Sequence, residues 1–190
     1  MARFARRFGL PVWMTHGTLA GFEGLFAEVQ TRLIENYATF EVGEIEVSPF
    51  PVPHDAREPA QFVFSDGVRR LGVLTDTGEA TRHIELMLSG CDALVLECNH
   101  DPDMLQASDY PRPVKERIAS RYGHLDNSAA AGLLASLDRS RLQHVVAAHL
   151  SQQNNRPQLA RAALSGVLGS EVTCLLVADQ DHGLDWVALD

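Results

Sequence analysis

The chain has 190 residues, of which 45% are hydrophobic and 22% are charged, and its formal net charge is −9 at pH 7. This length and composition are typical of one globular domain with a sizeable core, so we expect a single domain over residues 1–190. The negative charge argues against broad electrostatic binding of nucleic acid, and no run of about 18 apolar residues predicts a membrane span.

In chain order, the first half predicts a helix at Ala2–Phe8, a strand at residues 10–14, a polar loop at 15–18, a helix at 23–35, extended chain at 40–53 and a β-hairpin of residues 61–64 and 68–74. The second half predicts a helix at residues 79–89, a strand at 93–96, helices at 111–120 and 128–136, a strand at 142–148, a helix at 157–168 and strands at 172–178 and 183–189. Because strands and helices alternate in the second half, the predicted fold class is α/β.

The stretch from Leu71 to Asp103 carries the most polar groups at strand ends. One buried strand leads into Asp76, and the next leads into Glu97, Asn99 and His100. Two parallel strands joined by a helix have their carboxyl ends on the same side of a sheet, so these groups can lie near one another. A metal or acid–base site is one interpretation, and a helix cap formed by Asp76 is the other.

Two histidines follow strands in the same way, His54 after the proline-rich segment and His149 after residues 142–148. Together with Asp76 they would suit Zn²⁺, Mn²⁺ or Fe. The spacing between them forms no local motif, so each histidine could equally be a solvated or hydrogen-bonded side chain. The three cysteines, Cys91, Cys98 and Cys174, also lack metal-type spacing and indicate free thiols in a reducing cytoplasm.

The order of the flanking segments resembles the metallo-β-lactamase superfamily, in particular its YycJ/WalJ-type branch, which is related to ribonuclease Z-like and PhnP-like phosphodiesterases. The segments are PVPHDA (51–56), LTDTG (74–78), LVLECNHD (94–101), GHLDN (123–127) and AHLSQQNN (148–155). The resemblance covers nearly the whole chain and implies an αββα sandwich. It also implies metal ligation by His54, Asp76 and His149, with Asp76 bridging two divalent ions, Zn or Mn.

By the same resemblance, His124 is the candidate acid that protonates the leaving group. Further groups then fall near the metals or the substrate, namely Glu97, Asn99, His100, Asn127 and Ser151. Relatives usually have serine where this chain has Asp126, which is interpreted either as a helix cap or as a carboxylate that raises the basicity of His124. The cations Arg112, Lys115, Arg117 and Arg121 could steer a nucleic-acid backbone, although a solvated helix face is the simpler interpretation.

The sequence departs from the resemblance in one respect, because it has no His-x-His-x-Asp-His motif. In the family this motif supplies four metal ligands. We therefore expect an N-terminally incomplete fold, arising from truncation or a misassigned start codon rather than from a natural short form. Such a chain would hold metal weakly and have little or no activity alone. Its uncovered sheet edge and apolar surface would favour a homodimer.

Three functions follow from these observations. The first is a metal-dependent phosphodiesterase with 5′→3′ exonuclease activity on DNA, as the resemblance implies for the full-length protein. The second is a hydrolase of small cyclic phosphodiesters. The third is a non-catalytic α/β fragment or assembly module.

Overall fold

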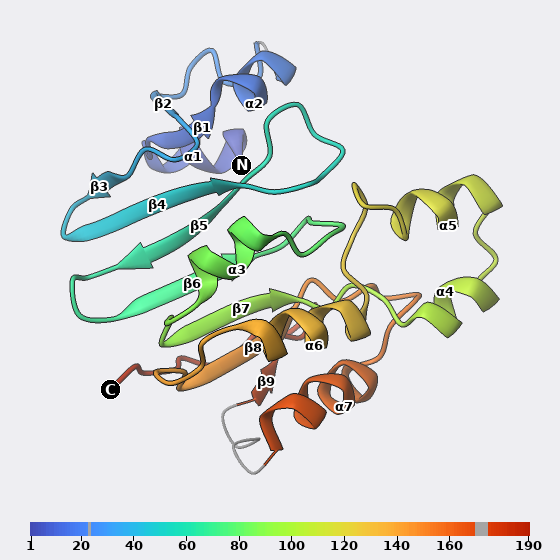
Figure 1. Ribbon diagram of the computed structural model, residues 1–190. Coiled ribbons are helices and arrows are strands. Elements are labelled where there is room, and N and C mark those ends of the chain that lie inside the picture. The colour runs from blue at the N-terminus through green and yellow to red at the C-terminus, as the bar shows by residue number, and fades with distance from the viewer. Residues whose placement is uncertain (23, 170–174) are drawn as a thin grey trace.

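The structure, a computed structural model, describes residues 1–22, 24–169 and 175–190 (Figure 1). Strands in these residues form a seven-stranded sheet, in the order β3-β4-β5-β6-β7-β8-β9, and a two-stranded sheet of β1 and β2. The predicted α/β class is confirmed. No helix in the described ranges has the length and apolar character needed to cross a membrane.

In chain order the elements are α1 (Ala2–Phe8), β1 (Val12–Thr15), α2 (His16–Gly21), β2 (Thr31–Ile34), β3 (Phe40–Val42), β4 (Ile45–Pro51), β5 (Ala60–Ser65), β6 (Arg70–Leu74), α3 (Arg82–Leu88), β7 (Ala93–Glu97), α4 (Pro102–Ala107), α5 (Arg112–Ile118), α6 (Asn127–Ser136), β8 (His144–Ala148), α7 (Pro157–Leu168) and β9 (Leu175–Val177).

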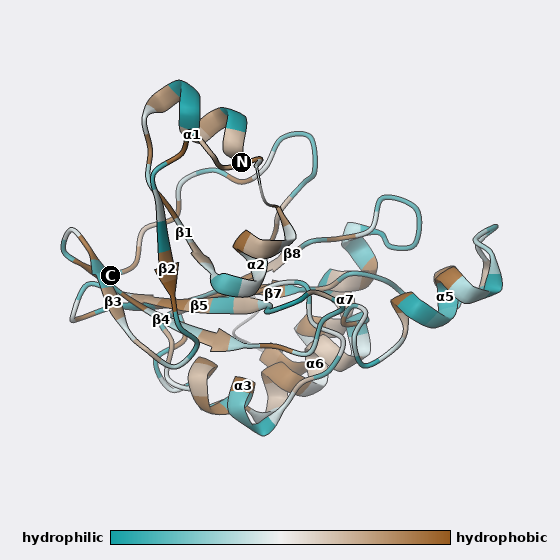
Figure 2. Cartoon of the chain, turned by 90° about the horizontal axis from the view of Figure 1, so that it is seen from above, coloured by the Kyte–Doolittle hydropathy of each residue, from teal (hydrophilic) through white to brown (hydrophobic). Residues whose placement is uncertain are grey.

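The large sheet changes from antiparallel to parallel pairing at β6. Strands β3 to β6 pair antiparallel, whereas β6, β7, β8 and β9 pair parallel. Seen from above, α3 and α6 lie on one side of this sheet, and α1, β1 and β2 lie on the other (Figure 2). The parallel pairing brings the carboxyl ends of β6, β7 and β8 to one edge, where the polar segments of the sequence begin.

The main core lies between the large sheet and its helices. Leu74 and Leu96 from the sheet, Ile84 from α3 and Leu164 from α7 are all fully buried. Each such side chain contributes about 1.5–3 kcal/mol by leaving water. A separate small core joins α1 to β1 and includes Ala5 and Met14. The parallel half of the sheet, which carries the polar edge, therefore rests on the larger core.

Local capping signals define where the helices begin. The Thr81 hydroxyl accepts a hydrogen bond from the N–H of Ile84 at the start of α3. The carboxylate of Asp126 accepts from the N–H groups of Ser128 and Ala129 at the start of α6, which confirms the interpretation of Asp126 as a cap. Because Thr81 caps α3, the alternative in which Asp76 caps this helix is wrong.

Several predicted elements differ from the structure. The helix predicted at residues 23–35 is wrong, because Thr31–Ile34 instead pairs with β1 as strand β2, while Glu23 lies outside the described residues. The polar loop predicted at 15–18 is the start of α2, which the Thr15 side chain caps. Residues 183–189 form no strand, and helix α4, with Asp101 as its cap, was not predicted. Of the strand predicted at 172–178, residues 175–177 are confirmed, and 172–174 lie outside the described part of the chain.

The free thiols of Cys91 and Cys98 are buried, and we expect both to be unreactive in the folded protein. Burial raises the pKa of the Cys91 thiol, and burial together with the negative charges of Glu97 and Asp126 raises the pKa of Cys98 from 9.0 to about 12. At pH 8 the thiolate fraction of Cys98 is then about a thousandfold below that of an ordinary cysteine. Titration with Ellman's reagent checks this expectation.

The titration uses a Cys174→Ser protein, so that Cys91 and Cys98 are the thiols that remain. Both should react promptly in denaturant and neither on the same time scale in buffer. Rapid reaction of two thiols in buffer would show that the core around β7 opens readily.

Candidate metal centre

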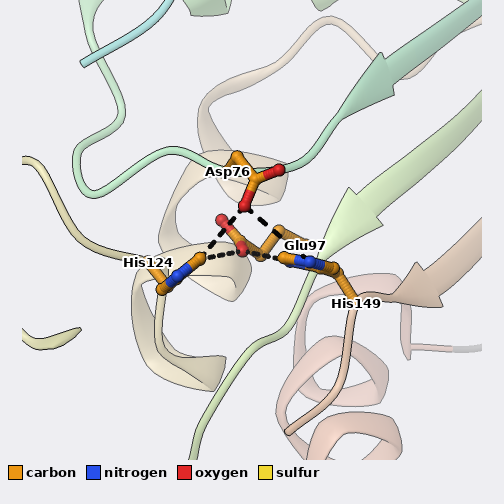
Figure 3. Close-up of side chains that lie close together, drawn as sticks. All are labelled: Asp76, Glu97, His124 and His149. Carbon is orange, nitrogen blue, oxygen red and sulfur yellow. Dashed lines mark hydrogen bonds and ion pairs between the residues drawn. The ribbon is translucent and has the colours of Figure 1, made fainter. Parts of the chain in front are cut away.

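Five side chains from separate segments meet at the edge where the parallel strands end. Asp76 follows β6, Glu97 is the last residue of β7, and His149 follows β8. His54 comes from the loop after β4, and His124 from the loop before α6. One donor atom from each of Asp76, Glu97, His124 and His149 lies within 4.8 Å of the others (Figure 3). The structure thus brings together the three predicted ligands and the predicted acid.

Glu97 is the centre of the hydrogen-bond network. Its side chain is fully buried, and its Oε1 accepts from Nδ1 of His124 at 2.8 Å and from Nδ1 of His149 at 2.7 Å. Its Oε2 accepts from the backbone N–H of Thr77 at 3.0 Å and of Leu125 at 3.3 Å. With two bonds on each oxygen, this carboxylate has no free position for a metal ion, so it orients the imidazoles instead.

The hydrogen bonds also fix the tautomers of the imidazoles. An ionised carboxylate only accepts, so His124 and His149 must donate their Nδ1–H to Glu97. His54 Nδ1 lies 3.0 Å from the carbonyl oxygen of Gly123, which likewise only accepts. His124 and His149 therefore keep Nε2 free, the arrangement that a metal-binding histidine usually shows. Nε2 of His54 lies 3.4 Å from Asp55 Oδ1, within ion-pair distance of that carboxylate.

Asp76 carries the unpartnered carboxylate of the group. Its Oδ1 lies 3.7 Å from Nε2 of His54 and 3.8 Å from Nε2 of His149, too far for a hydrogen bond. Two ligand atoms of one tetrahedral zinc ion lie about 3.4 Å apart at bond lengths of about 2.0–2.1 Å. The spacing thus fits shared ions held between the carboxylate and the two imidazoles.

His124 differs from the other two histidines in its orientation. The nitrogen that lies 3.6 Å from Asp76 Oδ1 is Nδ1, which Glu97 already engages. The imidazoles that turn Nε2 toward Asp76 are those of His54 and His149. This orientation fits His124 for proton transfer better than for ligation.

Unusual backbone angles place two of these side chains. Asp76 has φ 52° and His149 has φ 58°, both in the left-handed region that non-glycine residues rarely adopt. Such strained angles concentrate at functional sites, where the surrounding fold holds them. Here the angles turn the chain sharply at the ends of β6 and β8, so that both side chains face the cluster.

Close packing fixes the two loops that carry His54 and His124. The Gly78 N–H donates to Pro53 O at 3.0 Å, and the Asp55 N–H donates to Tyr122 O at 3.0 Å. A Cβ at Gly123 would collide with the Ile118 carbonyl, so the backbone before His124 needs glycine. The His54 loop is thereby tied to the segment after α5.

The remaining predicted residues lie around the cluster rather than in it. The Asn99 side chain donates to His149 O at 3.1 Å and so fixes the turn after β8. Ser151 Oγ accepts from the N–H of Asn154. Asn127 is buried in a reciprocal side-chain pair with Asn155, a residue that the sequence alone did not single out. His100 is buried beside a cavity between α4 and α5.

The cations of the α5 region are mostly paired. Arg112 lies 2.6 Å from Glu116, and Arg121 lies 3.1 Å from Glu79. Arg117 lies 2.5 Å from Asp55, which tethers α5 to the His54 loop. These arginines thus have carboxylate partners and present little free charge to a ligand.

Replacing Glu97 by glutamine is expected to lower the free energy of unfolding of the metal-free protein by about 2–4 kcal/mol at pH 6, because the amide nitrogen cannot accept two of the four bonds. Burial alone raises the pKa of Glu97, but bonds from His124, His149 and Thr77 outweigh it and lower the pKa from 4.5 to about 2. The stability from this carboxylate is therefore complete above pH 4.5 and lost as the pH falls toward 2.

The hydrogen bond between Glu97 and His149 also raises the pKa of His149 above 6.5. The contribution of His149 to stability is therefore complete below pH 6.5 and declines at higher pH. Urea unfolding in EDTA at several pH values should show the largest difference between variant and wild type from pH 4.5 to 6.5. Glu85→Gln is the matched control, because it removes one ion pair to an exposed arginine and should cost less than about 1 kcal/mol. Equal stability of the two variants would contradict the central position of Glu97.

The fold and the cluster together define an α/β protein with a histidine–carboxylate cluster that could hold metal at the carboxyl edge of its sheet. Residues 1–149 match the family described as "Beta-lactamase superfamily domain", and the chain belongs to the metallo-β-lactamase superfamily. It is 37% identical over 167 residues to "Exodeoxyribonuclease YycJ" of Bacillus anthracis, covering 86% of this chain and 63% of that protein. The chain thus spans less than two thirds of that relative's length.

"Exodeoxyribonuclease WalJ" of Streptococcus pneumoniae D39 is 28% identical over 191 aligned positions, covering 98% of this chain and 68% of that protein. Among solved structures, the metallo-beta-lactamase fold protein YhfI from Bacillus subtilis superposes with a TM-score of 0.71 at 16% identity, covering 97% of this chain and 68% of YhfI. Zn²⁺-bound PqqB from Methylobacterium extorquens superposes with a TM-score of 0.69 at 22% identity, covering 93% of this chain and 65% of PqqB. These structures share the fold, and the predicted membership in the superfamily is confirmed.

Proposed function

We propose that this chain carries one half of a two-metal hydrolase centre that cleaves phosphodiester bonds of DNA as an exonuclease. The observation that carries the proposal is the Asp76 carboxylate, which forms no hydrogen bond with the described residues and lies 3.7 and 3.8 Å from the Nε2 atoms of His54 and His149. The names of the YycJ and WalJ relatives support DNA as the substrate class. The free, buried thiols support a reducing cytoplasm as the compartment.

The chemistry divides among the residues as follows. When bound, two divalent ions, Zn or Mn, would supply positive charge at the phosphate and lower the pKa of water toward neutrality. Asp76 would hold metal through its carboxylate, and His54 and His149 through Nε2. Glu97 holds the rings of His124 and His149 in place, and His124 donates a proton to the departing oxygen.

The ligand count determines what the 190 residues do alone. The sequence contains no His-x-His-x-Asp-His motif, and His54, Asp76 and His149 are too few ligands to fill two metal positions. We therefore propose that the chain alone binds metal weakly and is inactive or weakly active. Metal analysis after dialysis tests this point, and less than one tightly held ion per chain is the expected value.

A second candidate substrate is a small cyclic phosphodiester. A diphosphatase of the PhnP family shares the fold with a TM-score of 0.61 at 17% identity, and the Asp76 side chain is 45% exposed, which is compatible with access by a small ester. We also propose self-association, because apolar side chains such as Phe4 and Leu33 are exposed on α1 and β2.

The deciding experiment compares DNA with a small diester. DNA labelled at the 5′ or the 3′ end and a small cyclic diester are incubated with Mn²⁺ or Zn²⁺ and a form of the protein that retains two ions. We expect metal-dependent release of nucleotides from DNA, starting at the 5′ end. Hydrolysis of the cyclic diester without any release from DNA would establish the second candidate instead. If this two-ion form hydrolyses neither substrate with any of these metals, both candidate functions are excluded.

A further inference from the structure

A polar cavity of about 810 Å³ lies between α4 and α5. Both helices extend beyond the carboxyl end of β7 (Figure 1). His100 and Asp126, which pair in a short parallel bridge, form its inner wall. His100 comes three residues after Glu97, and Asp126 two residues after His124. The cavity and the metal centre therefore share the same two loops, although no residue of the cavity belongs to the centre.

The cavity contains a cation without a carboxylate partner. Lys115 lines it and is the only lysine of the chain. Its Nζ donates to the carbonyl oxygen of Gln106 at 2.6 Å, and no ion pair to a carboxylate forms in the part of the chain that the structure describes. Two carboxylates also line the cavity, but Glu116 pairs with Arg112 at 2.6 Å, and Asp126 accepts from two backbone N–H groups of α6. The ammonium of Lys115 is therefore the charge in the cavity that can attract an anion such as phosphate.

The cavity also contains an unpaired polar group. His100 is 2% exposed, and its Nδ1 is buried and has no hydrogen-bond partner among the described residues. Buried polar atoms in folded proteins are normally paired, so a rotation of the His100 ring that brings Nδ1 into the cavity would let a ligand supply the missing partner. An edge of a nucleobase, which carries both donors and acceptors, can provide it.

Aromatic and apolar groups complete the lining. Tyr110, which is half-buried, and Leu105, which is buried, both line the cavity. An aromatic ring together with a cation is the combination that binds single-stranded nucleic acid, because the base stacks on the ring while the phosphate meets the charge. A volume of about 810 Å³ is ample for one nucleotide.

We propose that this cavity is a subsite for one nucleotide of a DNA strand, adjacent to the bond cut at the metal centre. Lys115 binds the phosphate, Tyr110 stacks on the base, and His100 hydrogen-bonds an edge of the base. This subsite rests on the proposed function for its substrate class. It goes beyond that function by assigning specificity to residues outside the metal centre.

The single lysine permits a direct test of binding without metal or turnover. Reductive methylation with ¹³C-formaldehyde labels the amines of Lys115 and Met1 and keeps their positive charge. In EDTA, titration with a tetrathymidylate strand should shift the Lys115 ¹³C signal and leave the Met1 signal unchanged. Inorganic phosphate at the same concentration should shift it much less, and thymidine 5′-monophosphate should give an intermediate effect.

Two outcomes of this titration would overturn the subsite. One is a Lys115 signal that stays constant while fluorescence anisotropy shows that the strand has bound. The other is an equal shift with inorganic phosphate, which would make the cavity a simple anion site.

Matched variants separate the parts of the subsite. Lys115→Gln should reduce the slope of log affinity against log salt by about 0.7, the value for one contact to a single strand. Arg3→Gln, which removes one exposed charge on α1, should leave the slope unchanged. Tyr110→Ala should weaken binding about tenfold by removing one stacked base, and Tyr110→Phe should not. Equal effects of Lys115→Gln and Arg3→Gln would contradict a specific contact.

The failure of the subsite and of the proposed function are distinguishable. Metal-dependent cleavage of DNA with no response at Lys115 would remove the subsite and leave the hydrolase. A shift of the Lys115 signal in a protein that cleaves no DNA with any metal would remove the hydrolase and leave the subsite.

Discussion

Replacing Asp76 by asparagine is expected to reduce metal-dependent hydrolysis about a thousandfold or more and to weaken metal binding. The ions contribute several kcal/mol to the transition state, and each 1.36 kcal/mol corresponds to a factor of ten in rate. Asparagine is the appropriate substitution because it tolerates the left-handed φ of 52° at this position, whereas alanine would add backbone strain. Metal binding is measured by calorimetric titration with Zn²⁺ or Mn²⁺, and hydrolysis by the rate on labelled DNA. Both measurements use the form of the protein that hydrolyses DNA.

The same variant separates ligation from a structural role. The Asp76 side chain is 45% exposed and forms no hydrogen bond with the described residues, so the metal-free Asp76→Asn protein should unfold within about 0.5 kcal/mol of wild type. Asp185→Asn, which changes an exposed carboxylate near the C-terminus, is the control for charge. A variant that loses stability but keeps its metal would show that Asp76 supports the loop rather than the ions.

Replacing His124 by glutamine is expected to lower the rate on DNA by about 10²–10⁴-fold while metal binding persists. The rate falls because a poor leaving group no longer receives a proton. Metal binding persists because the variant retains both His54 and His149. A diester with a p-nitrophenolate leaving group needs little protonation, so its hydrolysis should fall much less. Comparison of the two substrates, with metal content measured in parallel, checks the prediction.

The control for this second prediction is His182→Gln, since His182 is exposed near the C-terminus and lies outside the cluster. Equal losses on both substrates together with loss of metal would make His124 a ligand. Unchanged rates on DNA would remove it from the mechanism.

The sequence allowed much of the parallel half of the sheet to be predicted, because buried apolar runs there alternate with capped helices. From that alternation, β6, α3 and β7 and the shared edge of Asp76 and Glu97 followed directly. The helix predicted at residues 23–35 failed for a tertiary reason. The apolar spacing was compatible with a helix, but pairing of Thr31–Ile34 with Val12–Thr15 determines the conformation.

The internal geometry of the site could not be predicted from spacing. Nothing in the local sequence shows that Glu97 accepts from two imidazoles, because His124 and His149 are 27 and 52 residues away from it. The left-handed angles at Asp76 and His149 were equally hidden, since no glycine marks either turn. The free charge of Lys115 emerged only after the partners of the neighbouring arginines were known.

Both imidazoles of the buried network bind the same oxygen atom, Glu97 Oε1. The proposed proton donor, His124, and one proposed metal ligand, His149, are thus coupled through one atom. A stronger hydrogen bond from His149 Nδ1 to Glu97 Oε1 should weaken the hydrogen bond that the same oxygen accepts from His124 Nδ1. We therefore expect the acidity of His124 to increase when metal binds His149 and to decrease when the metal is lost. The protein without metal would then lack an effective proton donor.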